Sequence, residues 1–314
     1  MRFLFAIPHH FAPDGVGYHG STGPDPRPRQ LALAGCVTAL HGHFAGPAVE
    51  ADWGGRRLVP ANAPRHHVDV VVLTAGGRHV LDGFAYPTGF IHHHQVDCPP
   101  MELGHAARVF LAQRIGAYDW YGFLEDDLRL HDPWFFAKLD WFLAEAGEDK
   151  VLLPNRFEMS VRWPARKVYA DGPIRREQSP VHWNELGPET IEGRVMGRHL
   201  RFRRAANPHA GCWFLTGRQM DRFAAAPHFA DRDRSFIGPL ESAATLALMR
   251  SFALYKPALD CADFLEIEHQ DDRFMRVIAG LPPNRSVAVA GPQAKENPAS
   301  PSPQPSPRRG EETP

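Results

Sequence analysis

Three adjacent carboxylates, Glu125, Asp126 and Asp127, are the residues of this sequence best suited to do chemistry. They directly follow a short apolar run, residues 120–124, which predicts a buried strand. In open α/β sheets, ligands bind where the strands end, so this position favours a ligand site. Adjacent carboxylates repel one another unless a cation or hydrogen-bond donors neutralise them. Their hard oxygens suit Mg²⁺ or Mn²⁺, and Mg²⁺ commonly shares its coordination shell with substrate phosphates.

The same three residues also fit a simpler role as an acidic turn. A helix is expected to begin at Pro133, and acidic residues close to a helix start are stabilised by its dipole. In the metal-site alternative, an ion bridging a carboxylate and a diphosphate would stabilise the charge on a departing nucleoside diphosphate. The apolar strand before the cluster favours the metal site over the turn.

Residues 118–128, YDWYGFLEDDL, resemble the strand that carries the DxD-type motif of GT-A glycosyltransferases, here in an EDD form. The resemblance implies transfer of a sugar from a nucleoside-diphosphate sugar, by family pattern a UDP-sugar, to a hydroxyl acceptor. It also implies Mn²⁺ or Mg²⁺ as cofactor. By position, Asp127 would bind the metal, while Glu125 and Asp126 would contact the donor. Residues 2–8 resemble the first strand of that family, which places Pro8 beside the nucleotide.

Two further residues match the GT-A pattern by position. His269 ends a late strand, where the family carries a histidine that binds the metal. Glu241 lies at the start of a helix, where the family carries a catalytic acid, and a carboxylate there could take the acceptor proton in an inverting transfer. Each has a plainer interpretation: His269 as a surface residue in a charged loop, and Glu241 as an acid favoured by the helix dipole.

Trp213 lies in an apolar run, residues 212–216, that predicts another strand. The resemblance places this segment beside the donor and acceptor sugars, where the indole could stack on a sugar face. The alternative is that Trp213 belongs to the core, which is the commoner role of a buried tryptophan. Gly211, just before this strand, could allow a close backbone approach to a ligand.

Strand and helix patterns alternate along the chain, which predicts an α/β fold with a mainly parallel central sheet flanked by helices. Residues 1–283 are expected to form the GT-A catalytic domain, with a nucleotide-binding half at 1–130 and an acceptor half at 131–283. The irregular, arginine-rich segment 156–207 looks like an insertion that shapes the acceptor site. Residues 284–314 are rich in proline and serine and predict a disordered tail.

The composition of the chain narrows the classes of protein to which it can belong. A formal net charge of -1 over 314 residues gives no global electrostatic case for nucleic-acid binding. No apolar run is long enough for a transmembrane helix, and the four widely spaced cysteines predict reduced thiols in a cytoplasmic protein. His92, His93 and His94 would point to alternate faces of a strand, which disfavours a shared metal.

Two other classes could use the same acidic cluster. A metal-dependent phosphohydrolase would need more Asp or His ligands at other strand ends, and the amino-terminal half shows no DxH or GDxxD pattern. A non-catalytic carbohydrate-binding or Ca²⁺-binding protein is the second alternative, although the EF-hand spacing of acids around a glycine is absent. The donor sugar, the acceptor and the stereochemistry stay open at this level.

Overall fold

The computed structural model describes residues 1–15, 20–46, 48–61, 66–83, 89–160, 166–174 and 186–278. Residues 1–283 form one compact unit. The tail predicted at 284–314 lies outside the described residues. Helices and strands are mixed along the chain, so the predicted α/β class is confirmed. Among the described residues, no helix combines the length and apolar character needed to cross a membrane.

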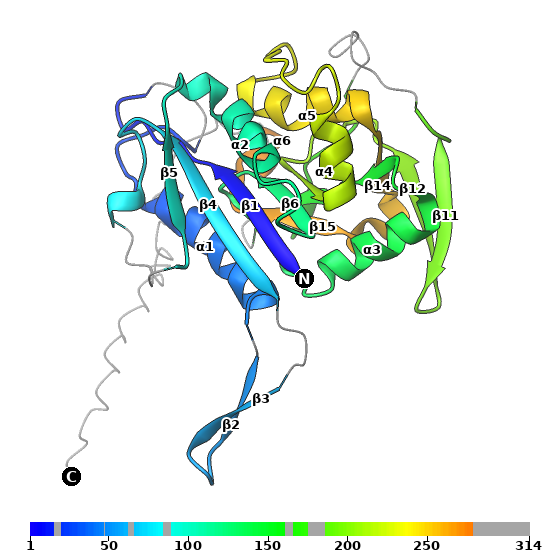
Figure 1. Cartoon of the computed structure of the whole chain (residues 1–314), viewed down its shortest axis with the longest axis horizontal. Coiled ribbons are helices and arrows are strands. Elements are labelled where there is room, and N and C mark those ends of the chain that lie inside the picture. Colours follow the sequence, from blue (N-terminus) through cyan, green and yellow to red (C-terminus); the bar gives the residue numbers. More distant parts are fainter. Residues whose placement is uncertain are drawn as a thin grey trace, which may run out of the picture. The chain divides into compact units, whose positions relative to one another are not determined.

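A five-stranded sheet lies at the centre of the unit (Figure 1), in the order β13-β6-β1-β4-β5. Its strands are β1 (Arg2–Pro8), β4 (His67–Ala75), β5 (His92–Val96), β6 (Trp120–Leu124) and β13 (Cys212–Thr216). β1 pairs in parallel with β4 and β6, β4 pairs in parallel with β5, and β13 is antiparallel to β6. Every residue of β6 is buried, as expected for an apolar strand covered on both faces.

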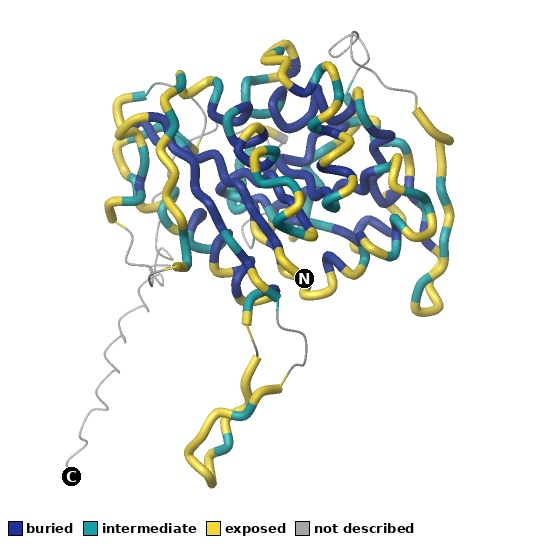
Figure 2. The backbone as a smooth tube through the Cα atoms, viewed as in Figure 1, coloured by how far each residue is buried: buried dark blue, intermediate teal, exposed yellow. Residues whose placement is uncertain are grey.

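Helices cover both faces of this sheet. On one face the ring of Phe3 packs against Phe44 of α1 (Arg27–Phe44) and Phe136 of α3 (Phe135–Ala146), with centroid distances of 5.9 and 4.6 Å. On the other face Trp213 packs against Phe223 of α4 (Gly217–Ala224), and α2 (Leu103–Ala112) packs against β1. β1, β4, β6 and β13 are almost entirely buried, whereas β5 at the edge of the sheet is mostly exposed (Figure 2).

Smaller sheets extend the fold, so a single mainly parallel sheet describes only its centre. One has the order β10-β9-β15-β7, a second β11-β12-β14-β8, and β2 and β3 form a hairpin. The remaining elements are β2 (Val49–Asp52), β3 (Arg57–Pro60), β7 (Leu128–Arg129), β8 (Lys150–Leu152), β9 (Asn155–Met159), β10 (Lys167–Tyr169), β11 (Thr190–Val195), β12 (Arg198–Arg204), β14 (Ala253–Pro257), β15 (Glu266–His269), α5 (Pro239–Ser251), α6 (Arg273–Ile278) and the 3-10 turns η1 (Leu81–Gly83), η2 (Pro100–Glu102) and η4 (Leu259–Phe264).

The segment 156–207 was predicted to be irregular, and for its described part this is wrong. β9, β10, β11 and β12 lie in or across it. In β12 the buried side chains Leu200 and Phe202 alternate with arginines, which is the period of a strand with one buried face. Met196 and Gly197 form the tight turn between β11 and β12, both with positive φ. The high arginine content of the segment masked this alternation in the sequence.

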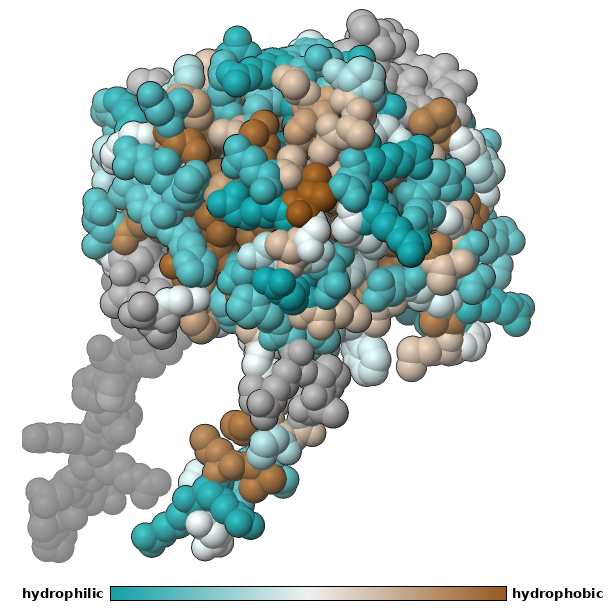
Figure 3. All heavy atoms as spheres, viewed as in Figure 1, coloured by the Kyte–Doolittle hydropathy of each residue, from teal (hydrophilic) through white to brown (hydrophobic). Residues whose placement is uncertain are grey.

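β2 and β3 form a hairpin in the stretch between α1 and β4. Val49 pairs with Pro60 and Asp52 pairs with Arg57, in antiparallel register. Val49, Trp53 and Leu58 are exposed, and Figure 3 shows hydrophobic surface on the part of the hairpin nearer the body of the protein. Two paired strands with so little burial gain little stability from a hydrophobic core.

Candidate functional site

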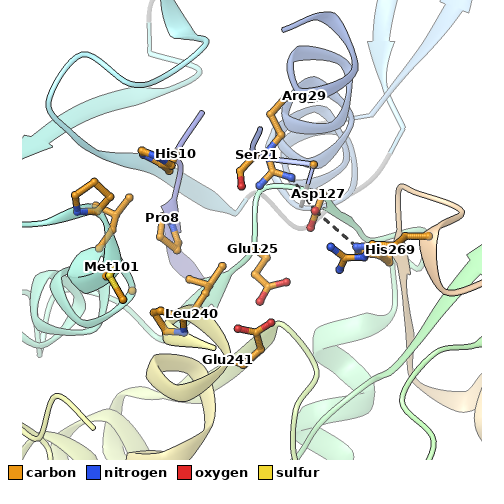
Figure 4. A pocket seen from close by; sticks show the side chains of 16 residues that line it. Pro8, His10, Ser21, Arg29, Met101, Glu125, Asp127, Leu240, Glu241 and His269 are labelled. Atoms are coloured by element: carbon orange, nitrogen blue, oxygen red, sulfur yellow. Dashed lines mark hydrogen bonds and ion pairs between the residues drawn. The ribbon is translucent and has the colours of Figure 1, made fainter. Parts of the chain in front are cut away.

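A pocket of about 320 Å³ opens where β1 and β6 end (Figure 4). Five of the seven residues predicted from the sequence line it: Pro8, Glu125, Asp127, Glu241 and His269. They come from strand ends and helix starts that are distant in the chain, as the rule for open α/β sheets anticipates. The two others, Asp126 and Trp213, lie outside its lining.

Asp126 is fully buried beneath the pocket and is held by two partners. Arg29 of α1 donates from Nη2 to Oδ1, and His9 bonds through Nδ1 to Oδ2. The backbone N–H of Val80 donates to His9 Nε2 over 3.1 Å, so the ring proton of His9 is on Nδ1 and is donated to Asp126. With both carboxylate oxygens occupied, Asp126 anchors the ends of β1 and α1 to the acidic loop.

Asp127 faces the pocket with one oxygen engaged and one without a partner. Arg29 donates from Nη1 to Asp127 Oδ2 over 2.8 Å, whereas Asp127 Oδ1 is buried without a hydrogen bond. Burial would raise the pKa of Asp127, but Arg29 and the nearby His269 together hold it well below its ordinary value. Asp127 is therefore an ionised carboxylate whose Oδ1 is unpartnered, while Oδ2, the oxygen that faces His269, also accepts from Arg29.

His269 presents Nε2 to the same carboxylate, 3.7 Å from Asp127 Oδ2. Its other nitrogen, Nδ1, bonds over 2.9 Å to Oε1 of Glu158, a fully buried residue of β9. Glu158 also accepts the backbone N–H groups of Phe274 and Met275 at the start of α6. A carboxylate that holds one histidine nitrogen and leaves the other free is the usual support of a metal-binding histidine.

The pair formed by Asp127 and His269 fits a divalent cation. Asp127 Oδ2 and His269 Nε2 lie 3.7 Å apart, so the carboxylate and the imidazole would be the protein's two ligands to an ion bound between them. In the part of the chain that the structure describes, no group of three or more His, Cys, Asp or Glu side chains is placed to hold a metal ion. Two protein ligands suit an ion that completes its shell with substrate phosphates and water.

Glu125 is buried at the bottom of the pocket, against the backbone of Gly211. Its backbone N–H donates to the Gly211 carbonyl over 2.9 Å, and a Cβ atom on Gly211 would lie only 2.7 Å from Glu125 Oε2. Gly211 therefore allows a close approach to Glu125, where the sequence suggested an approach to a ligand. Burial raises the pKa of Glu125 to about 8, against the opposing charge of Arg156, so the carboxyl is largely protonated at neutral pH.

A buried network of charges behind Glu125 was missed by sequence reasoning. Arg156 Nη1 lies 3.7 Å from Glu125 and donates from Nη2 to Asp171 over 2.8 Å. Lys256 Nζ donates to the other oxygen of Asp171 over 3.0 Å and to the carbonyl of His209 over 2.6 Å. Burial would raise the pKa of Asp171, but Lys256 and Arg156 lower it to about 2. These contacts fix the position of Arg156 beside the pocket.

Glu241 lies in the first turn of α5, and its carboxylate faces that of Glu125 in Figure 4. Both the catalytic and the helix-dipole interpretation of Glu241 fit this position. Trp213, by contrast, is fully buried, stacked on Phe123 at a centroid distance of 5.8 Å. An indole enclosed in this way cannot present a face to a sugar, so the structure gives Trp213 the core role. His92, His93 and His94 lie on β5, where neighbouring side chains point to opposite faces.

No known family model and no curated protein matches the sequence. Among solved structures, the fold is similar to that of GalNAc-T7 determined with UDP, GalNAc and Mn²⁺, with a TM-score of 0.43 and 9% sequence identity. The similarity covers 85% of this chain and 43% of that one.

Proposed function

We propose that this chain is a metal-dependent glycosyltransferase of the GT-A type, which moves a sugar from a nucleoside-diphosphate sugar to a hydroxyl acceptor. The observation that carries the proposal is the pair formed by Asp127 and His269. Their facing atoms are 3.7 Å apart, the histidine is oriented by Glu158, and both line a pocket that also holds Glu125 and Glu241.

The donor side of the proposed site contains cations and two metal ligands. Arg29 and Arg273 line the same pocket, and Arg29 already pairs with Asp126 and Asp127, so a diphosphate would compete with these carboxylates for its guanidinium. Asp127 and His269 would hold Mn²⁺ or Mg²⁺, and such an ion neutralises the charge that builds on a departing diphosphate. Pro8, at the end of β1, would lie beside the nucleotide, which by family pattern is a UDP-sugar. Asp126 acts below this surface by fixing Arg29.

Glu241 is the proposed general base of an inverting transfer. The acceptor oxygen forms a bond to the anomeric carbon while the bond from that carbon to the phosphate oxygen breaks. The nucleoside diphosphate leaves with the bonding electron pair, and the acceptor proton passes to the Glu241 carboxylate. A product that retains the donor's anomeric configuration, detected by NMR, would exclude this single displacement.

The test is a panel of sugar nucleotides incubated with Mn²⁺, with release of nucleoside diphosphate as the readout. We expect wild type to hydrolyse at least one donor slowly. The rate of Asp127→Ala should be at least tenfold lower than that of wild type. The matched control is Asp221→Ala, which removes an exposed acid on α4. If Asp127→Ala and Asp221→Ala release diphosphate at the wild-type rate, the proposed site is wrong.

A binding measurement separates a transferase from a protein that binds only metal. UDP with Mn²⁺ should raise the melting temperature of wild type more than Mn²⁺ alone, because a ligand of the folded state stabilises it by mass action. If Mn²⁺ alone produced the whole shift, the protein would be a metal-binding protein without a nucleotide site.

A further inference from the structure

The pocket has two walls of opposite character. The polar wall carries the charged and metal-binding groups Arg29, Asp127, His269 and Arg273. The apolar wall is made of Pro100, Met101, Leu103, Pro239 and Leu240. In Figure 4, Met101 and Leu240 lie on one side and Arg29, Asp127 and His269 on the other, with the carboxylates of Glu125 and Glu241 between them.

Close packing of two helix starts builds the apolar wall. A Cβ atom on Gly104 of α2 would lie 2.7 Å from the Cβ of Ala243 and 3.1 Å from Leu240 Cδ1, both on α5. The starts of α2 and α5 therefore meet, and two prolines without an N–H donor lie beside them: Pro100 in η2, just before α2, and Pro239 at the first position of α5. Met101 remains 53% exposed, so this wall offers a large apolar side chain that the protein itself leaves uncovered.

Charge assigns the two walls to different substrates. On the polar wall a diphosphate would be held by Arg273 and by an ion on Asp127 and His269, since Arg29 is already paired with Asp126 and Asp127. None of the apolar-wall residues carries a cation that would offset repulsion by Glu241. Since Glu241 is the proposed base, the acceptor hydroxyl must reach its carboxylate. The atoms next to that hydroxyl then lie against Leu240 and Met101.

Resting on the proposed function, we propose that the apolar wall binds the acceptor, and that the acceptor carries an aliphatic chain next to its nucleophilic hydroxyl. Burial of apolar surface against Met101 and Leu240 would supply much of its binding energy. Specificity for such an acceptor comes from a wall that gives sugar hydroxyls no hydrogen-bond partner.

The experiment offers simple alcohols as acceptors, with the best donor from the hydrolysis panel and Mn²⁺. Ethanol, butan-1-ol and hexan-1-ol compete with water, and the alkyl glycosides formed are measured by mass spectrometry. We expect kcat/KM for the alcohol to rise roughly twofold to fourfold for each added CH₂ group in wild type. Met101→Gln and Leu240→Asn should flatten this series, whereas Leu259→Asn, which changes an exposed leucine of η4, should keep it.

The dependence on chain length compares the kcat/KM values of different alcohols with the same variant. It is therefore independent of the overall activity of that variant. A flat series in wild type, or an unchanged slope in Met101→Gln and Leu240→Asn, overturns the proposal. If the slope persisted while their Kd for UDP rose, the wall would hold the nucleobase instead of the acceptor. Absence of diphosphate release from every donor by wild type is a different result, because it refutes the glycosyltransferase function itself.

Discussion

Replacing Gly211 with alanine tests how closely the backbone behind the pocket approaches Glu125. The φ of Gly211 is +66°, and a left-handed conformation costs an alanine about 1–2 kcal/mol. The new Cβ atom would also lie 2.7 Å from Glu125 Oε2 and 2.9 Å from a methyl carbon of Leu128. Overpacking of a buried site costs about 1–3 kcal/mol more. The expected loss in free energy of unfolding is therefore about 2–5 kcal/mol.

Gly76 provides a matched control, because its φ is +64° and a Cβ atom there would meet no atom within 4 Å. The free energy of unfolding of Gly76→Ala should fall only by the cost of the left-handed conformation, about 1–2 kcal/mol. Urea denaturation followed by circular dichroism, on both variants and wild type, gives the difference directly. Equal losses for Gly211→Ala and Gly76→Ala would show that the approach to Glu125 is not close, and the description of the pocket floor would be wrong.

Three further perturbations probe other parts of the site. The pKa of Glu125 is raised from 4.5 to about 8 in the folded state. Between these two values the folded protein keeps a proton on Glu125 that the unfolded chain releases. The free energy of unfolding of wild type, relative to that of Glu125→Gln, should therefore fall as the pH rises from about 5 to 8. Urea denaturation of both proteins at each pH tests this, and a constant difference between their free energies of unfolding would contradict it. Glu158→Gln should weaken Mn²⁺ binding about 10–100-fold by loosening His269, and an unchanged Kd in calorimetry would refute that role. Asp171→Asn leaves two buried cations without their carboxylate and should cost about 3–5 kcal/mol of stability, whereas Asp260→Asn, at an exposed ion pair, should cost less than about 1 kcal/mol. Similar decreases in melting temperature for Asp171→Asn and Asp260→Asn would contradict the burial of the network.

Local sequence patterns, together with the resemblance to GT-A enzymes, pointed to the residues of the proposed site that lie at strand ends and helix starts. Glu125 and Asp127 come directly after an apolar run, and a helix start preceded by a glycine-proline pair placed Glu241. His269 closes a short run, residues 264–268, in which apolar side chains alternate with acids. Each of these patterns involves only a few neighbouring residues, so it can be recognised in the sequence without knowledge of the fold.

The supporting residues gave no such signal, because their roles exist only through contacts with distant parts of the chain. Glu158 lies 111 residues before the histidine that it orients, and Arg29 lies 98 residues before Asp127. Lys256 and Asp171 look like ordinary surface charges in the sequence. For Trp213, the strand was predicted correctly, but which face of the sheet its side chain occupies depends on register and on the helix packed there.

The anchoring of Asp126 also bears on how the chain folds. Its two partners, His9 and Arg29, precede it by 117 and 97 residues. Contacts of such long sequence separation form only after the entropy of closing large loops has been overcome, which slows folding. During synthesis from the amino terminus, the first strand and helix emerge long before the carboxylate that joins them. Until then His9 and Arg29 have no Asp126, and the pocket is complete only once Glu241, His269 and Arg273 have also been synthesised.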